Sequence, residues 1–176
     1  QEVRSSRART RYTLGVVAMD SCHHILLRQW LKGLSLVPDK DVRIVVIPPG
    51  QALRNLRAQT LDGYCVGEPW NSVAVSRGVG EIVLSTAQIW RRGVEKVLAM
   101  RQNVLEEKRE VVERLIRALC RAGEHFVDPE NWDSNADILA RPEYLDDSAD
   151  LIRKAISDQL LIAREGPLVH YPDFMF

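Results

Sequence analysis

The sequence predicts an α/β fold, in which a mainly parallel sheet is flanked by helices. Short apolar runs rich in β-branched residues, at 12–18, 41–47 and 64–66, have the composition of strands buried on both faces. Segments with helical spacing of apolar residues separate these runs. Strands that alternate with helices in this way form βαβ units, whose crossovers are right-handed.

Each of these strands is followed by a predicted helix. Asp20 or Ser21 caps the first helix, which keeps apolar residues at helical spacing through Leu34. The second helix opens at the Pro48-Pro49-Gly50 break. The third begins at Pro69, because proline is tolerated in the first helical turn. Two further strands are predicted, at 81–84 and 96–100.

After residue 102 the pattern changes to helices alone. Helical periods are predicted within 103–126, 129–139 and 147–160, followed by an extended tail at 166–176. The chain therefore divides into three predicted parts. These are a linker or the end of a preceding element at 1–11, an α/β ligand-binding lobe at 12–102, and C-terminal helices with the tail at 103–176.

Composition limits the function classes. The 176 residues are 45% hydrophobic and balance 24 basic against 24 acidic side chains, so no net field attracts nucleic acid or anionic lipid. No apolar run approaches the ~20 residues of a membrane span, and no cofactor motif is present. Cys22, Cys65 and Cys120 form an odd set without metal-type spacing, which argues against a disulfide framework or a metal site. The start at Gln1 is typical of a segment of a longer protein.

The segment 61–71 carries the strongest local signal. A strand that ends at Gly67 and turns into a helix presents backbone N–H groups at the carboxyl edge of the sheet, which suits an anion. An ordinary βα turn explains the same pattern equally well. Because a carboxylate here would repel an anion, Glu68 is expected to point away or to pair with Lys96 or Arg77.

Other residues near strand ends are candidates for the same site. His23, at a helix start, is expected to be a neutral N–H donor, or simply a solvated histidine. Lys96 is either a surface lysine or a cation for the anion, and Trp70 is either a wall of the site or a packing residue. Pro49 offers a rigid apolar wall. Cys65 could act as a nucleophile only with His23, but a thiol in an apolar strand should have a raised pKa and be inert.

Several motifs occur in a fixed order along the chain. They are Ser-Cys-His at 21–23, Leu-Arg-Gln-Trp-Leu at 27–31, Asp-Gly-Tyr-Cys-Val-Gly-Glu-Pro-Trp-Asn at 62–71, Glu-Lys-Val-Leu-Ala-Met at 95–100, Arg-Pro-Glu-Tyr-Leu at 141–145 and Tyr-Pro-Asp-Phe at 171–174. This series resembles the nitrate- and bicarbonate-binding solute receptors, a family that includes cytosolic nitrate and nitrite sensors. Gln29 departs from the tyrosine usual in that family.

The resemblance implies the second lobe of a two-lobed type II periplasmic binding protein, with C-terminal helices that pack back on the first lobe. It also implies that four residues line the anion site: His23, Pro49, Gly67 and Lys96. Candidates for the layer of residues around them are Ser21, Val66, Glu68 and Trp70. The remaining ligand contacts of the family belong to the first lobe.

The donors of this site suit nitrate or nitrite, because these anions only accept hydrogen bonds. In the bicarbonate branch of the family an acidic residue stands where Lys96 does, so Lys96 favours nitrate or nitrite. The resemblance implies a non-catalytic solute-binding component that docks on an ABC permease, and hence a periplasmic or membrane-attached location. The alternative is a cytoplasmic sensor that controls an RNA-binding antiterminator; an enzyme on the same scaffold would need turnover that depends on Cys65 or His23.

Overall fold

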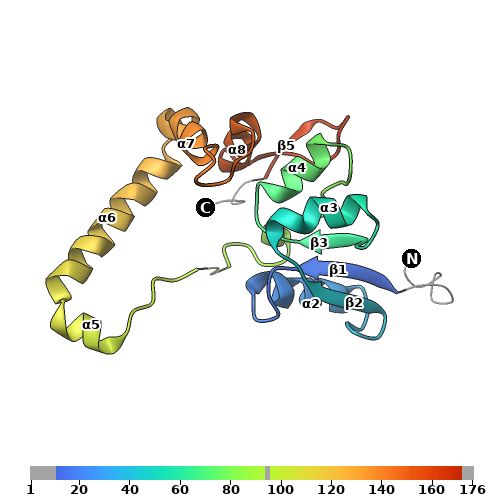
Figure 1. Cartoon of the computed structure of the whole chain (residues 1–176), viewed down its shortest axis with the longest axis horizontal. Coiled ribbons are helices and arrows are strands. Elements are labelled where there is room, and N and C mark those ends of the chain that lie inside the picture. The colour runs from blue at the N-terminus through green and yellow to red at the C-terminus, as the bar shows by residue number, and fades with distance from the viewer. Residues whose placement is uncertain (1–10, 94–95, 172–176) are drawn as a thin grey trace.

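The centre of the molecule is a three-stranded parallel sheet of order β2-β1-β3 (Figure 1). The computed structural model describes residues 11–93 and 96–171. The strands are β1 (Tyr12–Val16), β2 (Val42–Val46) and β3 (Gly63–Cys65). In register, Leu14 of β1 lies opposite Ile44 of β2 on one side and Gly63 of β3 on the other. Each strand matches its prediction to within two residues, and the predicted α/β class is confirmed.

Helices cover both faces of this sheet. The chain passes from β1 to β2 through α2 (Cys22–Gly33), and from β2 to β3 through η2 (Pro49–Gln51) and α3 (Ala52–Arg57). Because these two crossovers run in opposite directions across the sheet, α2 lies on one face and α3 on the other (Figure 1). Helix α4 (Trp70–Ser76) follows β3 directly.

The residues of β1 alternate between the two faces. Val16 is fully buried and packs with Leu27 and Leu31 of α2. On the opposite face stands Gly15, where an added Cβ would lie 2.7 Å from Cδ1 of Ile47 and 3.1 Å from Cδ1 of Leu61. Gly15 therefore lets the layer around α3 approach the sheet closely.

The C-terminal part contains two units. A helical arm, α5 (Gln102–Glu107) and α6 (Arg109–Val127), extends away from the sheet (Figure 1). The other unit begins with η4 (Pro129–Asn131) and continues with α7 (Trp132–Leu139), α8 (Ala149–Ile156) and the antiparallel hairpin β4 (Gln159–Leu161) and β5 (Leu168–His170). Ala136, Ile152 and Ile156 form the core between α7 and α8. None of the helices within the described ranges is long and apolar enough to cross a bilayer.

Some predicted elements were wrong. Residues 81–84 and 96–100 form no strand, and Val83 and Val97 are 80% and 76% exposed. An extended segment becomes a strand only beside a partner strand, so apolar composition alone did not suffice. The helix expected through 103–126 is divided at Lys108, and the one expected through 147–160 ends at Ile156. The hairpin was not predicted, and residues 172–176 of the expected tail lie outside the described residues.

Candidate functional site

A topological switch point lies between β1 and β3. The chain runs from β1 to β2 on one side of β1, and the next crossover brings it from β2 to β3 on the other side. Open α/β sheets bind ligands at such points, outside the carboxyl ends of the strands. Here the loop after β1 leads to His23 at the start of α2, and the turn after β3 carries Gly67. A Cβ on Gly67 would lie 4.0 Å from Nε2 of His23. The structure thus brings together two of the four residues predicted to bind the anion.

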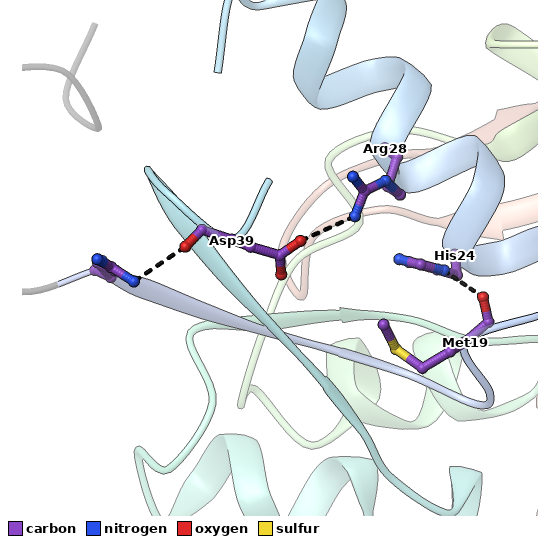
Figure 2. A network of polar contacts seen from close by, with 5 residues as sticks. Met19, His24, Arg28 and Asp39 are labelled. Carbon is purple, nitrogen blue, oxygen red and sulfur yellow. Dashed lines mark hydrogen bonds and ion pairs between the residues drawn. The ribbon is translucent and has the colours of Figure 1, made fainter. Parts of the chain in front are cut away.

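Hydrogen bonds within the loop fix the start of α2. Ser21 is the N-cap, one of the two residues predicted for that role: its Oγ accepts from the backbone N–H of His24 at 3.2 Å and donates to the carbonyl of Ala18 at 2.7 Å. The buried ring of His24 donates from Nδ1 to the carbonyl of Met19 at 2.5 Å (Figure 2). Together these bonds set the direction of the first helical turn, from which His23 projects.

The same helix is tied to the loop that precedes β2. Nη1 of Arg28 lies 3.1 Å from Oδ2 of Asp39, and Arg11 donates to the backbone carbonyl of Asp39 at 3.0 Å (Figure 2). Both side chains of the Arg28–Asp39 ion pair are largely exposed, so it contributes little to stability. The pair links the middle of α2 to the loop before β2.

The turn after β3 is braced by side chains of its own motif. Asn71 donates from Nδ2 to the carbonyl of Val66 at 2.9 Å, and the Tyr64 hydroxyl donates to the carbonyl of Trp70 at 3.0 Å. These two bonds span Gly67 and connect the end of β3 to the start of α4. Sequence reasoning did not assign Asn71 or Tyr64 this role, although both belong to the decapeptide that it singled out.

The side chain of Glu68 is bound at the start of α4. Its Oε2 accepts from the backbone N–H of Ser72 at 3.2 Å, so the carboxyl group caps its own helix. Burial raises the pKa of Glu68, and hydrogen bonds from Ser72 and Asn71 oppose that rise only in part. Burial, with the nearby charge of Glu68, raises the pKa of Tyr64 to about 12.

The remaining predicted residues occupy different positions. Half-buried Pro49 opens η2 at the carboxyl end of β2, and Cη2 of Trp70 lies 3.6 Å from where a Cβ of Gly50 would stand. The Trp70 indole therefore joins α4 to the loop after β2. Val66 is buried beneath the turn. Lys96 is exposed in an irregular segment, and its part in the site stays a prediction.

Comparison with known proteins assigns this sequence to a family. The sequence profile of the NMT1-like family matches residues 1–140. The chain belongs to the NMT1-like family.

Relatives of this NMT1-like chain include parts of much longer proteins. It is 39% identical over 140 residues to the nitrate import ATP-binding protein NrtC of Synechocystis sp. and 36% identical over 140 residues to the bicarbonate transport ATP-binding protein CmpC of Synechococcus elongatus. It is 31% identical over 143 residues to the nitrate/nitrite binding protein NrtA of Nostoc sp.. These matches cover 80–81% of the chain, but 21% of NrtC and of CmpC and 32% of NrtA. The chain thus spans a third or less of these relatives.

Solved structures show the same fold. The periplasmic nitrate-binding protein NrtA from Synechocystis matches with a TM-score of 0.91 and 24% identity, over 99% of this chain and 46% of that one. The ligand-binding component of an ABC-type import system from Staphylococcus aureus matches with a TM-score of 0.73 and 18% identity, over 85% of this chain and 50% of that one. At these identities the likeness concerns the fold alone, and it confirms the predicted lobe of a type II periplasmic binding protein.

Cys65 of the NMT1-like chain is a poor candidate nucleophile. Burial raises the pKa of Cys65 to about 11, as expected for a thiol inside an apolar strand, so at neutral pH it is protonated and a poor nucleophile. Within 11–93 and 96–171, no three side chains of His, Cys, Asp or Glu are grouped to hold a metal ion.

Proposed function

We propose that the complete protein containing this chain binds nitrate or nitrite and presents it to the permease of an ABC-type transporter, without catalysing a reaction. The observation that carries the proposal is the approach of His23 Nε2 to Gly67 at the switch point between β1 and β3. The names of the relatives NrtA and NrtC support this ligand class and this kind of assembly.

The residue types at the site match the chemistry of these anions. Nitrate and nitrite are small, planar and able only to accept hydrogen bonds. An imidazole N–H of His23 and the backbone N–H groups of the turn at Gly67 would donate to the anion oxygens, and the ammonium of Lys96 would add a positive charge. Pro49 and Trp70 would supply apolar walls that exclude water.

Bicarbonate is the rival ligand, because CmpC is named as part of bicarbonate transport. Bicarbonate carries a proton that requires an acceptor, whereas a lysine at position 96 can only donate. We therefore propose that Lys96 selects for nitrate or nitrite. Calorimetric titration of the complete protein with nitrate, nitrite and bicarbonate tests the ligand class. Lys96→Glu should weaken nitrate binding at least about tenfold, and unchanged nitrate affinity would exclude this role.

We further propose that this chain forms one lobe of a two-lobed receptor, in which the arm of α5 and α6 packs on the other lobe. The arm exposes an apolar row on α6, formed by Val111, Leu115, Ile116 and Leu119. The NrtA structure supports the proposal, since this chain corresponds to less than half of it. The chain alone should bind nitrate much more weakly than the complete protein, because half of the contacts and the exclusion of water would be missing. Equal affinities would contradict the two-lobe proposal.

A further inference from the structure

The turn that would bind the anion also contains a carboxyl group. Glu68 follows Gly67 directly, and its Oε2 is held by the backbone N–H of Ser72 at 3.2 Å inside the first turn of α4. An ionised carboxylate in this partly buried position would repel an anion at Gly67, because burial lowers the effective dielectric constant between them.

The residues around Glu68 affect the protonation state of its carboxyl group. Ser72 and Asn71, on the same helix, donate hydrogen bonds to the carboxyl group. Tyr64, on β3, is the titratable side chain whose pKa responds to the charge of Glu68. His23, on α2, approaches the same turn, with its Nε2 4.0 Å from where a Cβ of Gly67 would stand. Burial favours the neutral form of the carboxyl group and raises its pKa.

We propose that the protonation state of Glu68 controls the affinity of the neighbouring anion site, so that binding is tight with a neutral Glu68 and weak with an ionised one. The inference rests on the proposed anion-binding function. It assigns Glu68 as a positioning and electrostatic residue that does not itself touch the ligand. The neutral carboxyl keeps its bond to Ser72 through the carbonyl oxygen, so the turn keeps its shape while its charge changes.

The direction of the effect follows from linkage. A bound anion makes ionisation of Glu68 less favourable, so its pKa is higher with the anion bound than without it. Binding at a pH above the pKa of the unliganded state therefore takes up a proton from solvent. If the bound anion raises the pKa of Glu68 by one, nitrate binds about tenfold more tightly to the protein with neutral Glu68 than to the protein with ionised Glu68.

The test is calorimetric titration of the complete protein with sodium nitrate from about pH 5 to about pH 8. Nitrate remains a monoanion throughout, so a change in affinity reports on the protein. Because a change of pH acts on every titratable group, the comparison is with Glu68→Gln, which keeps an acceptor for Ser72 and has no charge. The matched control is Glu165→Gln, which removes an exposed carboxylate in the turn between β4 and β5.

Nitrate affinity of the unmodified protein should fall about tenfold or more across this range, and the Glu68→Gln variant should lose most of that fall while Glu165→Gln keeps it. Parallel profiles for the unmodified protein and Glu68→Gln would overturn the inference. No nitrate binding at any pH would instead reject the proposed function. A second measurement is independent of the variant. At the pH where the nitrate affinity of the unmodified protein falls most steeply, nitrate binding should increase the infrared carbonyl band of protonated carboxyl groups, and no increase would equally overturn the inference.

Discussion

The side-chain amide of Asn71 donates a hydrogen bond of 2.9 Å to the carbonyl oxygen of Val66, across the turn that contains Gly67. This bond ties the first turn of α4 to the end of β3. Because Gly67 has no side chain with which to hold its own position, the backbone geometry of the turn depends on such bonds. The turn is therefore shaped by a residue that lies outside the predicted set of anion-binding residues.

Replacement of Asn71 should disturb both stability and binding. Asn71→Ala leaves the Val66 carbonyl without this donor and should lower the free energy of unfolding by about 1–2 kcal/mol. In the complete protein, nitrate affinity should fall, because the N–H groups of the turn lose their fixed direction. Urea unfolding and calorimetry measure the two effects. Asn103→Ala, at an exposed position of α5, should change neither quantity; an Asn71→Ala protein with both values unchanged would remove Asn71 from this role.

Glu68 should make stability depend on pH. Its pKa is raised in the folded state, so folding favours the protonated form, and the stability linked to it is lost as pH rises through the folded-state pKa. The Glu68→Gln variant has no ionisable carboxyl group at this position. Its free energy of unfolding should therefore fall less than that of the unmodified chain as pH rises toward neutrality. Urea unfolding at several pH values checks this, and equal slopes for both proteins would be the contrary result.

The three thiols should differ in reactivity. Cys65 is partly buried and its pKa is raised to about 11 by burial, whereas Cys120 is exposed on α6. At neutral pH, iodoacetamide should alkylate Cys120 well before Cys65, and Cys65 should react readily only after denaturation. Peptide mass spectrometry over a time course measures the order of labelling. Rapid labelling of native Cys65 would show that β3 opens or that the thiol is activated.

Local sequence patterns predicted the strands and the switch-point residues for a physical reason. The 12–16, 42–46 and 63–65 strands are buried by their own neighbours in the chain, so their apolar composition reports their environment. Parallel strands also bring their carboxyl ends to one edge, which is why His23 and Gly67 could be expected together.

The predicted elements that proved wrong also have a physical explanation. Strand pairing at 81–84 and 96–100 depends on a partner that local composition does not specify, and the three-residue strands β4 and β5 are too short to show a period. The hydrogen bond from the backbone N–H of Ser72 to Glu68 was not predicted, because residue type alone does not specify which donor a carboxylate finds.

Gly15 should be intolerant of any side chain. A Cβ there would approach Cδ1 of Ile47 to 2.7 Å, so Gly15→Ala should lower the free energy of unfolding by about 1–3 kcal/mol through overpacking. Gly123→Ala is the matched control, since nothing lies within 4 Å of its Cβ position in α6. That change should stabilise the helix by about 0.5–1 kcal/mol. Thermal unfolding compares the two, and a neutral Gly15→Ala would mean that the α3 layer can move away from the sheet.

Substitutions in the exposed apolar row of α6 should lower the free energy of unfolding only in the complete protein, where a second lobe is present. Leu119 is 49% exposed in this chain, so Leu119→Gln should change the stability of the chain alone by less than about 0.5 kcal/mol. In the complete protein, where we propose that the row is covered, the same change should cost about 2 kcal/mol. Arg121→Gln, on the opposite side of the helix, should be neutral in both proteins. Urea unfolding of the two variants in both proteins decides the matter: equal costs of Leu119→Gln in the two proteins would mean that α6 is not an interface between lobes.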